Sequence, residues 1–194
     1  VGLVSGAGIS DFGHQVRCAD IDKQKIDLLN DGSIPIYEPG LKILVARNVN
    51  AKRLTFTVDV EDAIKWAEVI FIAVGTPQGE NGEADISAVK AVAEQIGKNL
   101  NNYKVISTKS TVPIGTGKMI QKIIDEDNLD KIKYDYCSNP EFLREGAAVR
   151  DFLHPDRIVL GSTSGKAFEY LKDVYRPLYI NETPMVHTTV ETAE

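Results

Sequence analysis

Two carboxylates, Glu141 and Glu145, are the residues whose type and spacing most directly suggest chemistry in this sequence. They lie four residues apart and follow Pro140, so we predict a helical turn that places both side chains on one face. A carboxyl group beside a bound water can act as a general base when burial raises its pKa. The alternative is a solvated helix start, whose acidic residues favour the positive end of the helix dipole.

Polar turns follow two neighbouring predicted strands. Residues 104–108 are predicted to form a strand that ends in hydroxyl groups, and the segment 109–116 (KSTVPIGT) continues it with further hydroxyl groups, including that of Thr111. An earlier apolar strand ends in the same way, with Gly75 and Thr76. Because parallel strands end at one edge of a sheet, we expect these turns to form one rim of a ligand crevice.

Strand and helix patterns alternate along the chain, which predicts a doubly wound, mostly parallel α/β sheet with helices on both faces. The segment 69–74 is wholly apolar and favours a strand covered on both faces. Two loops are expected, at 33–40 and 75–83. Strands are predicted at 16–19, 54–57, 69–74, 104–108, 134–138, 157–161 and 185–188, and helices at 3–12, 23–30, 41–48, 61–66, 85–100, 117–125 and 166–175.

Asp20 ends the strand 16–19, where a dinucleotide-binding fold places a carboxylate that accepts hydrogen bonds from the adenosine ribose. The glycine fingerprint would lie about 20 residues earlier. Gly2 would then be its last glycine, and the first strand and the earlier glycines are expected to be missing. Gly6 and Gly8 are interpreted as small residues that let a helix pack against the sheet. Lys25 could contact ribose or phosphate, or be solvated.

Composition limits which classes of protein the chain can belong to. The chain has 194 residues, a net charge of −6 and 43% hydrophobic residues, which is typical of one globular domain or slightly more. No basic run or long apolar stretch indicates a nucleic-acid or membrane partner. Cys18 and Cys137 are interpreted as buried, reduced thiols of a cytoplasmic protein, and the three histidines lack metal-ligand spacing, so no metal is expected.

These motifs together resemble the UDP-glucose 6-dehydrogenases, within the UDP-glucose/GDP-mannose dehydrogenase family. The likeness runs almost from end to end. The matching segments are VGLVSG at 1–6, DID at 20–22, PIYEPGL at 35–41, VGTP at 74–77, KSTVPIGT at 109–116, NPEFLREG at 139–146 and the segment 151–161.

The resemblance implies a Rossmann-like fold and an NAD-dependent oxidoreductase of polysaccharide biosynthesis. Members oxidise UDP-glucose to UDP-glucuronate with two NAD⁺ and one water, through a cysteine thioester. Residues 1–194 would be the NAD-binding domain, truncated at both ends. The central dimerisation helix, the C-terminal UDP-binding domain and the catalytic cysteine would lie outside the chain, so we expect it to be inactive alone and the complete enzyme to be a homodimer or larger homo-oligomer.

The resemblance also assigns roles to residues. Cofactor contacts fall on residues that begin the chain, follow the strand 16–19 or line the nicotinamide pocket. Thr111, Glu141 and Glu145 match catalytic positions, and residues 141–145 match the sugar-binding loop. The implied cofactor residues are Val1, Gly2, Asp20, Lys25, Thr76, Thr111 and Glu145, and the implied substrate residues are Glu141, Phe142, Leu143, Arg144 and Glu145.

Several alternatives remain open at this level. Another nucleotide sugar, GDP-mannose or a UDP-N-acetylhexosamine, could be the substrate. A dehydrogenase of the hydroxyacid or 6-phosphogluconate type is a second enzyme class, although the carboxylate pair and the loop 35–40 count against it. A non-catalytic nucleotide-binding module is the third possibility.

Overall fold

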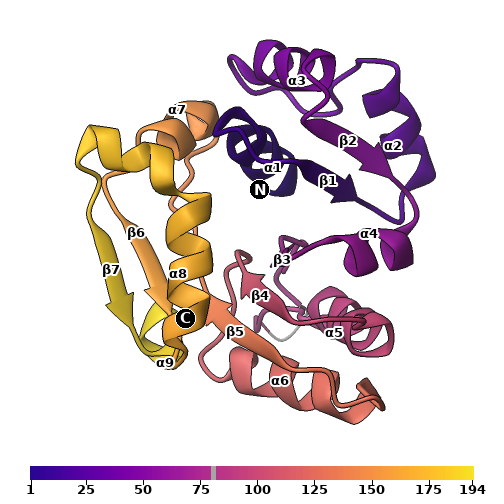
Figure 1. Cartoon of the computed structure of the whole chain (residues 1–194). Helices are drawn as coiled ribbons and strands as arrows, with labels where there is room; N and C mark the ends of the chain where they lie inside the picture. Colours follow the sequence, from indigo (N-terminus) through magenta and orange to yellow (C-terminus); the bar gives the residue numbers. More distant parts are fainter. Residues whose placement is uncertain (80–81) are drawn as a thin grey trace. The chain divides into compact units, whose positions relative to one another are not determined.

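In the computed structural model, the described residues 1–79 and 82–194 form two compact units (Figure 1). Each unit is assembled from three stretches of the chain. The first unit comprises Val1–Ala63, Phe142–Arg157 and Lys172–Pro184, and the second comprises Ile64–Glu141, Ile158–Leu171 and Met185–Glu194. The predicted loop 75–83 includes residues 80 and 81, which lie outside the described residues.

The first unit contains a two-stranded parallel sheet, in which β1 (Val16–Ala19) pairs with β2 (Leu54–Thr57). Its helices are α1 (Gly2–Asp11), α2 (Lys23–Asn30), α3 (Leu41–Asn50), α7 (Ala148–Leu153) and a 3₁₀ helix (Arg176–Asn181). The helices α4 (Val60–Trp66) and α8 (Gly165–Val174) each contribute to both units.

Two glycines of α1 allow close packing, as the sequence predicted. A Cβ atom on Gly6 would overlap the Sγ atom of Cys18, and one on Gly8 would overlap the ring of Phe152. A larger residue at either position would therefore push α1 away from β1 or α7. Gly6 and Gly8 are thus packing residues.

The second unit contains a five-stranded sheet in the order β3-β4-β5-β6-β7 (Figure 1). Its pairs are parallel except that β5 and β6 meet antiparallel at Ser138 and Gly161. This confirms the predicted mostly parallel α/β architecture. The elements are β3 (Val69–Ile72), α5 (Ser87–Asn99), β4 (Lys104–Thr108), α6 (Thr116–Asp127), β5 (Tyr134–Ser138), β6 (Ile158–Gly161), β7 (Met185–Thr188) and α9 (Val190–Ala193).

Strand β4 is the most buried strand of the second unit, since all five of its residues are buried. It pairs with β3 in parallel on one side and with β5 in parallel on the other. The helices α5 and α6 pack against each other beside these strands (Figure 1). The residues that leave the carboxyl ends of β3, β4 and β5 are thereby held by the best-packed part of the sheet.

Two expectations about the backbone are wrong. Residues 141–145 are not helical, since the helix α7 begins only at Ala148. Gly146 has a φ of 80°, which interrupts a right-handed helix, and Glu38 accepts hydrogen bonds from the N–H groups of Gly146 (3.0 Å) and Ala148 (2.8 Å) at the new start. The strands also form two hydrogen-bonded sheets among the described residues, where one sheet was expected.

Among the described residues, no helix is both long and apolar enough to span a membrane.

Candidate functional site

The first unit holds the predicted ribose-binding carboxylate at the carboxyl end of β1. One oxygen of Asp20 accepts a hydrogen bond from the Asp22 N–H group (3.0 Å), and the other accepts one from the Lys25 ammonium. Burial acts to raise the pKa of Asp20, but these hydrogen bonds prevail and hold it below its usual value. Asp20 is therefore a fixed anion, which suits the acceptance of hydrogen bonds from a ribose diol.

The start of α1 lies in the same unit and packs beside β1. Val1 is its N-cap residue, Gly2 is its first helical residue, and no side chain caps the first turn. The N–H groups of an uncapped first turn form an anion site that suits a pyrophosphate. These residues therefore fit the phosphate and ribose parts of a dinucleotide.

The second unit brings together the two hydroxyl-bearing turns that the sequence predicted to form one rim. The Thr76 hydroxyl donates to the backbone carbonyl of Thr111 at 2.8 Å, and the Ser110 hydroxyl donates to the carbonyl of Val74 at 2.7 Å. The turns after β3 and β4 are thus cross-linked by two hydrogen bonds. The side chain of Thr111 is exposed and available for a ligand.

Glu141 leaves the sheet at the same edge, because β5 runs parallel to β4 and ends three residues earlier. Its Oε2 atom is buried and has no hydrogen-bond partner among the described residues. Burial raises the pKa of Glu141, and the charge of Lys109 partly opposes that rise. A carboxyl group with a raised pKa and an unoccupied oxygen has the properties of a general base or acid.

The rest of the predicted sugar-binding loop belongs to the first unit. Arg144 makes three hydrogen bonds to Asp151: its backbone N–H group (3.0 Å) and Nε atom (3.0 Å) bond Oδ2, and its Nη2 atom (2.7 Å) bonds Oδ1. Phe142 is 54% exposed, with the guanidinium of Arg157 5.3 Å from its ring centroid. Leu143 is half-buried, and Glu145 is exposed. The loop is therefore anchored through Arg144, while Glu145 lacks the burial that distinguishes Glu141.

Two residues beside Glu141 were not predicted as site residues. Lys109, directly after β4, is 4% exposed and donates a hydrogen bond to the side-chain oxygen of Asn139 at 3.2 Å. Both lie inside motifs that the sequence singled out, but burial of the ammonium depends on tertiary packing. The available sequence signal was the position of Lys109 and Asn139 directly after two predicted strands, 104–108 and 134–138.

The two cysteines lack the properties of a nucleophile. Burial raises the pKa of Cys18 to about 12 and that of Cys137 also to about 12, so both are neutral thiols at neutral pH. Both are free thiols; Cys137 is buried, as predicted, whereas Cys18 is half-buried. The described residues include no group of three or more His, Cys, Asp and Glu side chains arranged to hold a metal ion.

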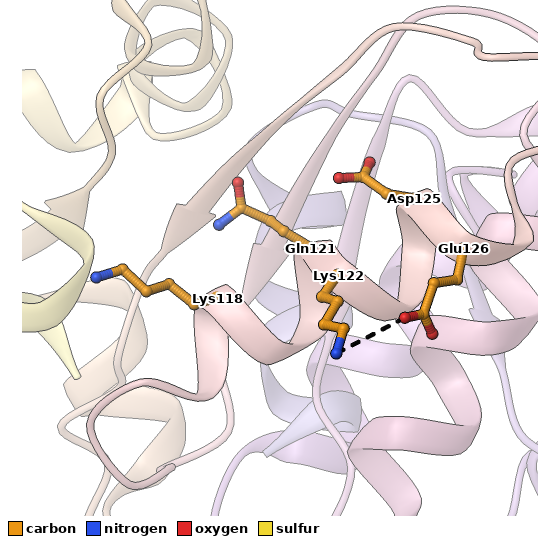
Figure 2. A pocket seen from close by; sticks show the side chains of 5 residues that line it. All are labelled: Lys118, Gln121, Lys122, Asp125 and Glu126. Carbon is orange, nitrogen blue, oxygen red and sulfur yellow. Dashed lines mark ion pairs between the residues drawn. The ribbon is translucent and has the colours of Figure 1, made fainter.

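A shallow surface hollow lies on α6, and Figure 2 shows its lining. All five side chains come from this one helix, and the ammonium of Lys122 lies 3.8 Å from the carboxylate of Glu126. Mixed charges on one exposed helical face are typical of a solvated surface, so we assign no function to it. The lining residues are Lys118, Gln121, Lys122, Asp125 and Glu126.

Comparison with known proteins agrees with this geometry. A model of the NAD-binding domain of the UDP-glucose/GDP-mannose dehydrogenase family matches residues 1–179. The chain is 50% identical over 194 residues to the UDP-glucose 6-dehydrogenase TuaD of Bacillus subtilis, covering all of this chain and 41% of that protein. The chain thus spans less than half the length of this relative.

Solved structures show the same fold. The UDP-glucose dehydrogenase of Pyrobaculum islandicum superposes with a TM-score of 0.94 and 35% identity, over 99% of this chain and 44% of that one. The GDP-mannose dehydrogenase of Pseudomonas aeruginosa gives 0.93 and 34%, over 100% of this chain and 45% of that one. The fold is therefore Rossmann-like, and the cofactor that the matched domain binds is NAD. This chain belongs to the UDP-glucose/GDP-mannose dehydrogenase family, as its NAD-binding domain.

Proposed function

We propose that the complete protein carrying this chain oxidises the C6 alcohol of UDP-glucose to the carboxylate of UDP-glucuronate. Each turnover converts one alcohol, one water and two NAD⁺ into one carboxylate, two NADH and three protons. The name of the 50% identical relative supports UDP-glucose as the substrate. The observation that carries the proton chemistry is the buried, unpartnered oxygen of Glu141 at the edge where β4 and β5 end.

In this proposal the first unit holds the cofactor by its adenosine half. Asp20 accepts hydrogen bonds from the ribose, Lys25 fixes the orientation of Asp20, and the start of α1 at Val1 and Gly2 faces the pyrophosphate. Thr76 and Thr111 line the nicotinamide side in the second unit. The bound nicotinamide supplies the hydride acceptor.

Glu141 handles the protons of the reaction. Hydride departure from an alcohol carbon requires that the hydroxyl proton leaves, and the later hydrolysis requires an activated water. The Oε2 atom of Glu141 can accept either proton directly or through water, and the hydroxyl of Thr111 can hold that water. Burial brings the pKa of Glu141 closer to neutrality, which suits a group that gains and loses a proton in each cycle.

Sugar binding and aldehyde capture are assigned from the chemistry of the side chains that could perform them. The segment 142–145 contacts the sugar, with Arg144 fixed by Asp151. The thiol that captures the aldehyde comes from outside these 194 residues, because burial keeps both Cys18 and Cys137 protonated. A dimerisation segment and a UDP-binding domain in the rest of the protein would complete the enzyme.

GDP-mannose is the second candidate substrate. The GDP-mannose dehydrogenase structure resembles this chain almost as closely as the UDP-glucose dehydrogenase structure does, with TM-scores of 0.93 and 0.94. The similarity of this domain therefore supports the type of reaction more strongly than it supports the identity of the sugar.

The test is turnover by the complete protein with NAD⁺ and a nucleotide sugar. We expect two NADH per UDP-glucose consumed, and UDP-glucuronate as the product. Turnover with GDP-mannose alone would keep the reaction and change the substrate. Failure to oxidise any nucleotide sugar would contradict the proposed function.

A further inference from the structure

Lys109 is a buried cation for which the proposed chemistry has so far given no role. It is the first residue after β4, and its backbone N–H group donates to the carbonyl of Ile72 at 2.8 Å. Its side chain is directed to Asn139, the first residue after β5, with Nζ 3.2 Å from Oδ1. A charged group placed this deeply is costly unless it has a partner or a function.

Asn139 is held rigidly in the orientation that receives Lys109. Its backbone N–H group donates to the carbonyl of Thr108 at 2.8 Å, and its Nδ2 atom donates to the carbonyl of Val159 at 2.9 Å. The side-chain oxygen is therefore left to accept the hydrogen bond from the ammonium. With an exposure of 1%, Asn139 has little freedom to turn elsewhere.

This pair stands at the base of both loops that carry the proposed proton chemistry. Thr111 comes two residues after Lys109, and Glu141 comes two residues after Asn139. The hydrogen bond between Lys109 and Asn139 consequently ties together the two chain segments that leave the sheet toward Thr111 and Glu141. A shift of one segment would be transmitted to the other.

The charges of the cluster are coupled. Burial lowers the pKa of Lys109 to about 8, while Glu141 and Cys137 act to raise it. Burial raises the pKa of Glu141, and the charges of the N-terminal ammonium and, to a smaller extent, of Lys109 act to lower it. The Cys137 thiol is neutral, since burial raises its pKa to about 12. The ammonium of Lys109 is thus a cation of the second unit that favours the ionised form of Glu141.

We propose that Lys109 is a positioning residue of this site, which fixes the Glu141 loop through Asn139 and keeps the Glu141 carboxyl group ionised for proton transfer. The role rests on the proposed function, because it assigns Lys109 to the base of that same reaction. Lys109 contacts neither sugar nor cofactor in this assignment. Its effect is exerted on Glu141.

Lys104 provides a matched control at the other end of the same strand. It is 0% exposed, and its Nζ atom donates to the carbonyls of Lys65 (3.2 Å) and Ala67 (2.5 Å) and to the side chain of Asn102 (2.8 Å). The first two carbonyls lie at the end of α4, so Lys104 closes a helix C-terminus. Loss of Lys104 should affect folding, with no effect on the protonation of Glu141.

The experiment measures kcat/KM for the nucleotide sugar against pH in the complete protein. A base must be ionised, so activity falls at acidic pH as Glu141 gains a proton. Removal of a neighbouring positive charge raises the pKa of a carboxyl group, and we expect Lys109→Met to move this acidic limb upward by about 1–3 pH units. Lys109→Gln retains a donor for Asn139 without the charge, and should move the limb in the same direction. Lys109→Arg should return it toward that of the unmodified protein.

The control variant Lys104→Met should unfold at a lower urea concentration than the unmodified protein, and the acidic limb of its kcat/KM profile should stay at the same pH. If Lys109→Met folds and the acidic limb of its kcat/KM profile does not shift, the proposal is overturned. If Lys109→Met does not fold, the same measurement on Lys109→Gln decides the question. If the unmodified protein oxidises no nucleotide sugar, the proposed function fails. The role of Lys109 is then decided by ¹³C NMR titration of Glu141, whose pKa must be higher in Lys109→Gln than in the unmodified protein.

Discussion

Two lysine–carboxylate pairs follow strands of this protein, and their environments differ. In the first unit, Lys25 and the N–H group of Asp22 both donate to Asp20, and the pKa of that carboxyl group falls below its usual value despite partial burial. In the second unit, burial prevails over the charge of Lys109, and the pKa of Glu141 rises. A carboxyl group with a lysine nearby thus has a lowered pKa in the first unit and a raised pKa in the second.

The difference separates binding from proton transfer. A carboxylate with a lowered pKa stays ionised over the working pH range and can accept hydrogen bonds from a ligand without changing its state. A carboxyl group with a raised pKa exchanges its proton more readily near neutral pH, which catalysis requires. The balance of hydrogen bonding against burial decides which task each pair can perform.

The largest effect is expected at the second pair. Glu141→Gln keeps the shape of the side chain and removes its ability to accept a proton, so kcat should fall about 10²–10⁴-fold. Steady-state kinetics of NADH formation in the complete protein measures this loss. The control is Glu145→Gln, which alters an exposed carboxylate and should cost far less. Equal losses in the two variants would contradict the distinction between Glu141 and Glu145.

The first pair should respond in binding. Asp20→Asn removes the negative charge that ribose hydroxyls would bond, and loss of a hydrogen bond to a charged group costs about 1.5–3 kcal/mol. The dissociation constant for NAD⁺ should therefore rise about 10–150-fold, as measured by calorimetric titration. Asp22→Asn is the control, because Asp22 caps α2 and asparagine caps a helix equally well. Unchanged affinity in Asp20→Asn would remove Asp20 from the cofactor site.

The smallest effect on function is expected from Lys104, the buried lysine without a neighbouring catalytic carboxylate. Lys104→Met leaves the carbonyl of Ala67 without its Lys104 donor, whereas the carbonyl of Lys65 keeps the hydrogen bond from the Asn101 amide, and an unsatisfied buried group costs about 1–3 kcal/mol. Urea unfolding should show this loss in the free energy of unfolding. A large fall in kcat without any loss of stability would show that Lys104 has a role beyond folding.

Local patterns predicted the elements well. The helix at 23–30 and the strands at 104–108 and 134–138 have the predicted bounds, because apolar periodicity and turn residues delimit them within the segment itself. The segment 141–145 was predicted wrongly as helical. There, the left-handed Gly146 and the distant carboxylate of Glu38 determine where the helix starts.

The candidate site was predictable in its hydroxyls and carboxylates, but its electrostatics were not. The turns at Thr76 and Thr111 follow predicted parallel strands, so their proximity could be inferred from topology. The burial of Lys109 depends on how β4, β5 and the following segments pack together. Spacing of Glu141 and Glu145 suggested an equivalent pair, whereas the structure half-buries Glu141, with its Oε2 atom fully covered, and leaves Glu145 exposed.

The most direct test is a ¹³C NMR titration of Asp20 and Glu141 side-chain carboxyl carbons in the complete protein, with resonances assigned through Asp20→Asn and Glu141→Gln. We predict that Asp20 titrates below the usual range of aspartic acid and Glu141 above the usual range of glutamic acid. A Glu141 that titrates at or below its usual value would contradict its assignment as the group that exchanges protons, whatever the activity of the protein.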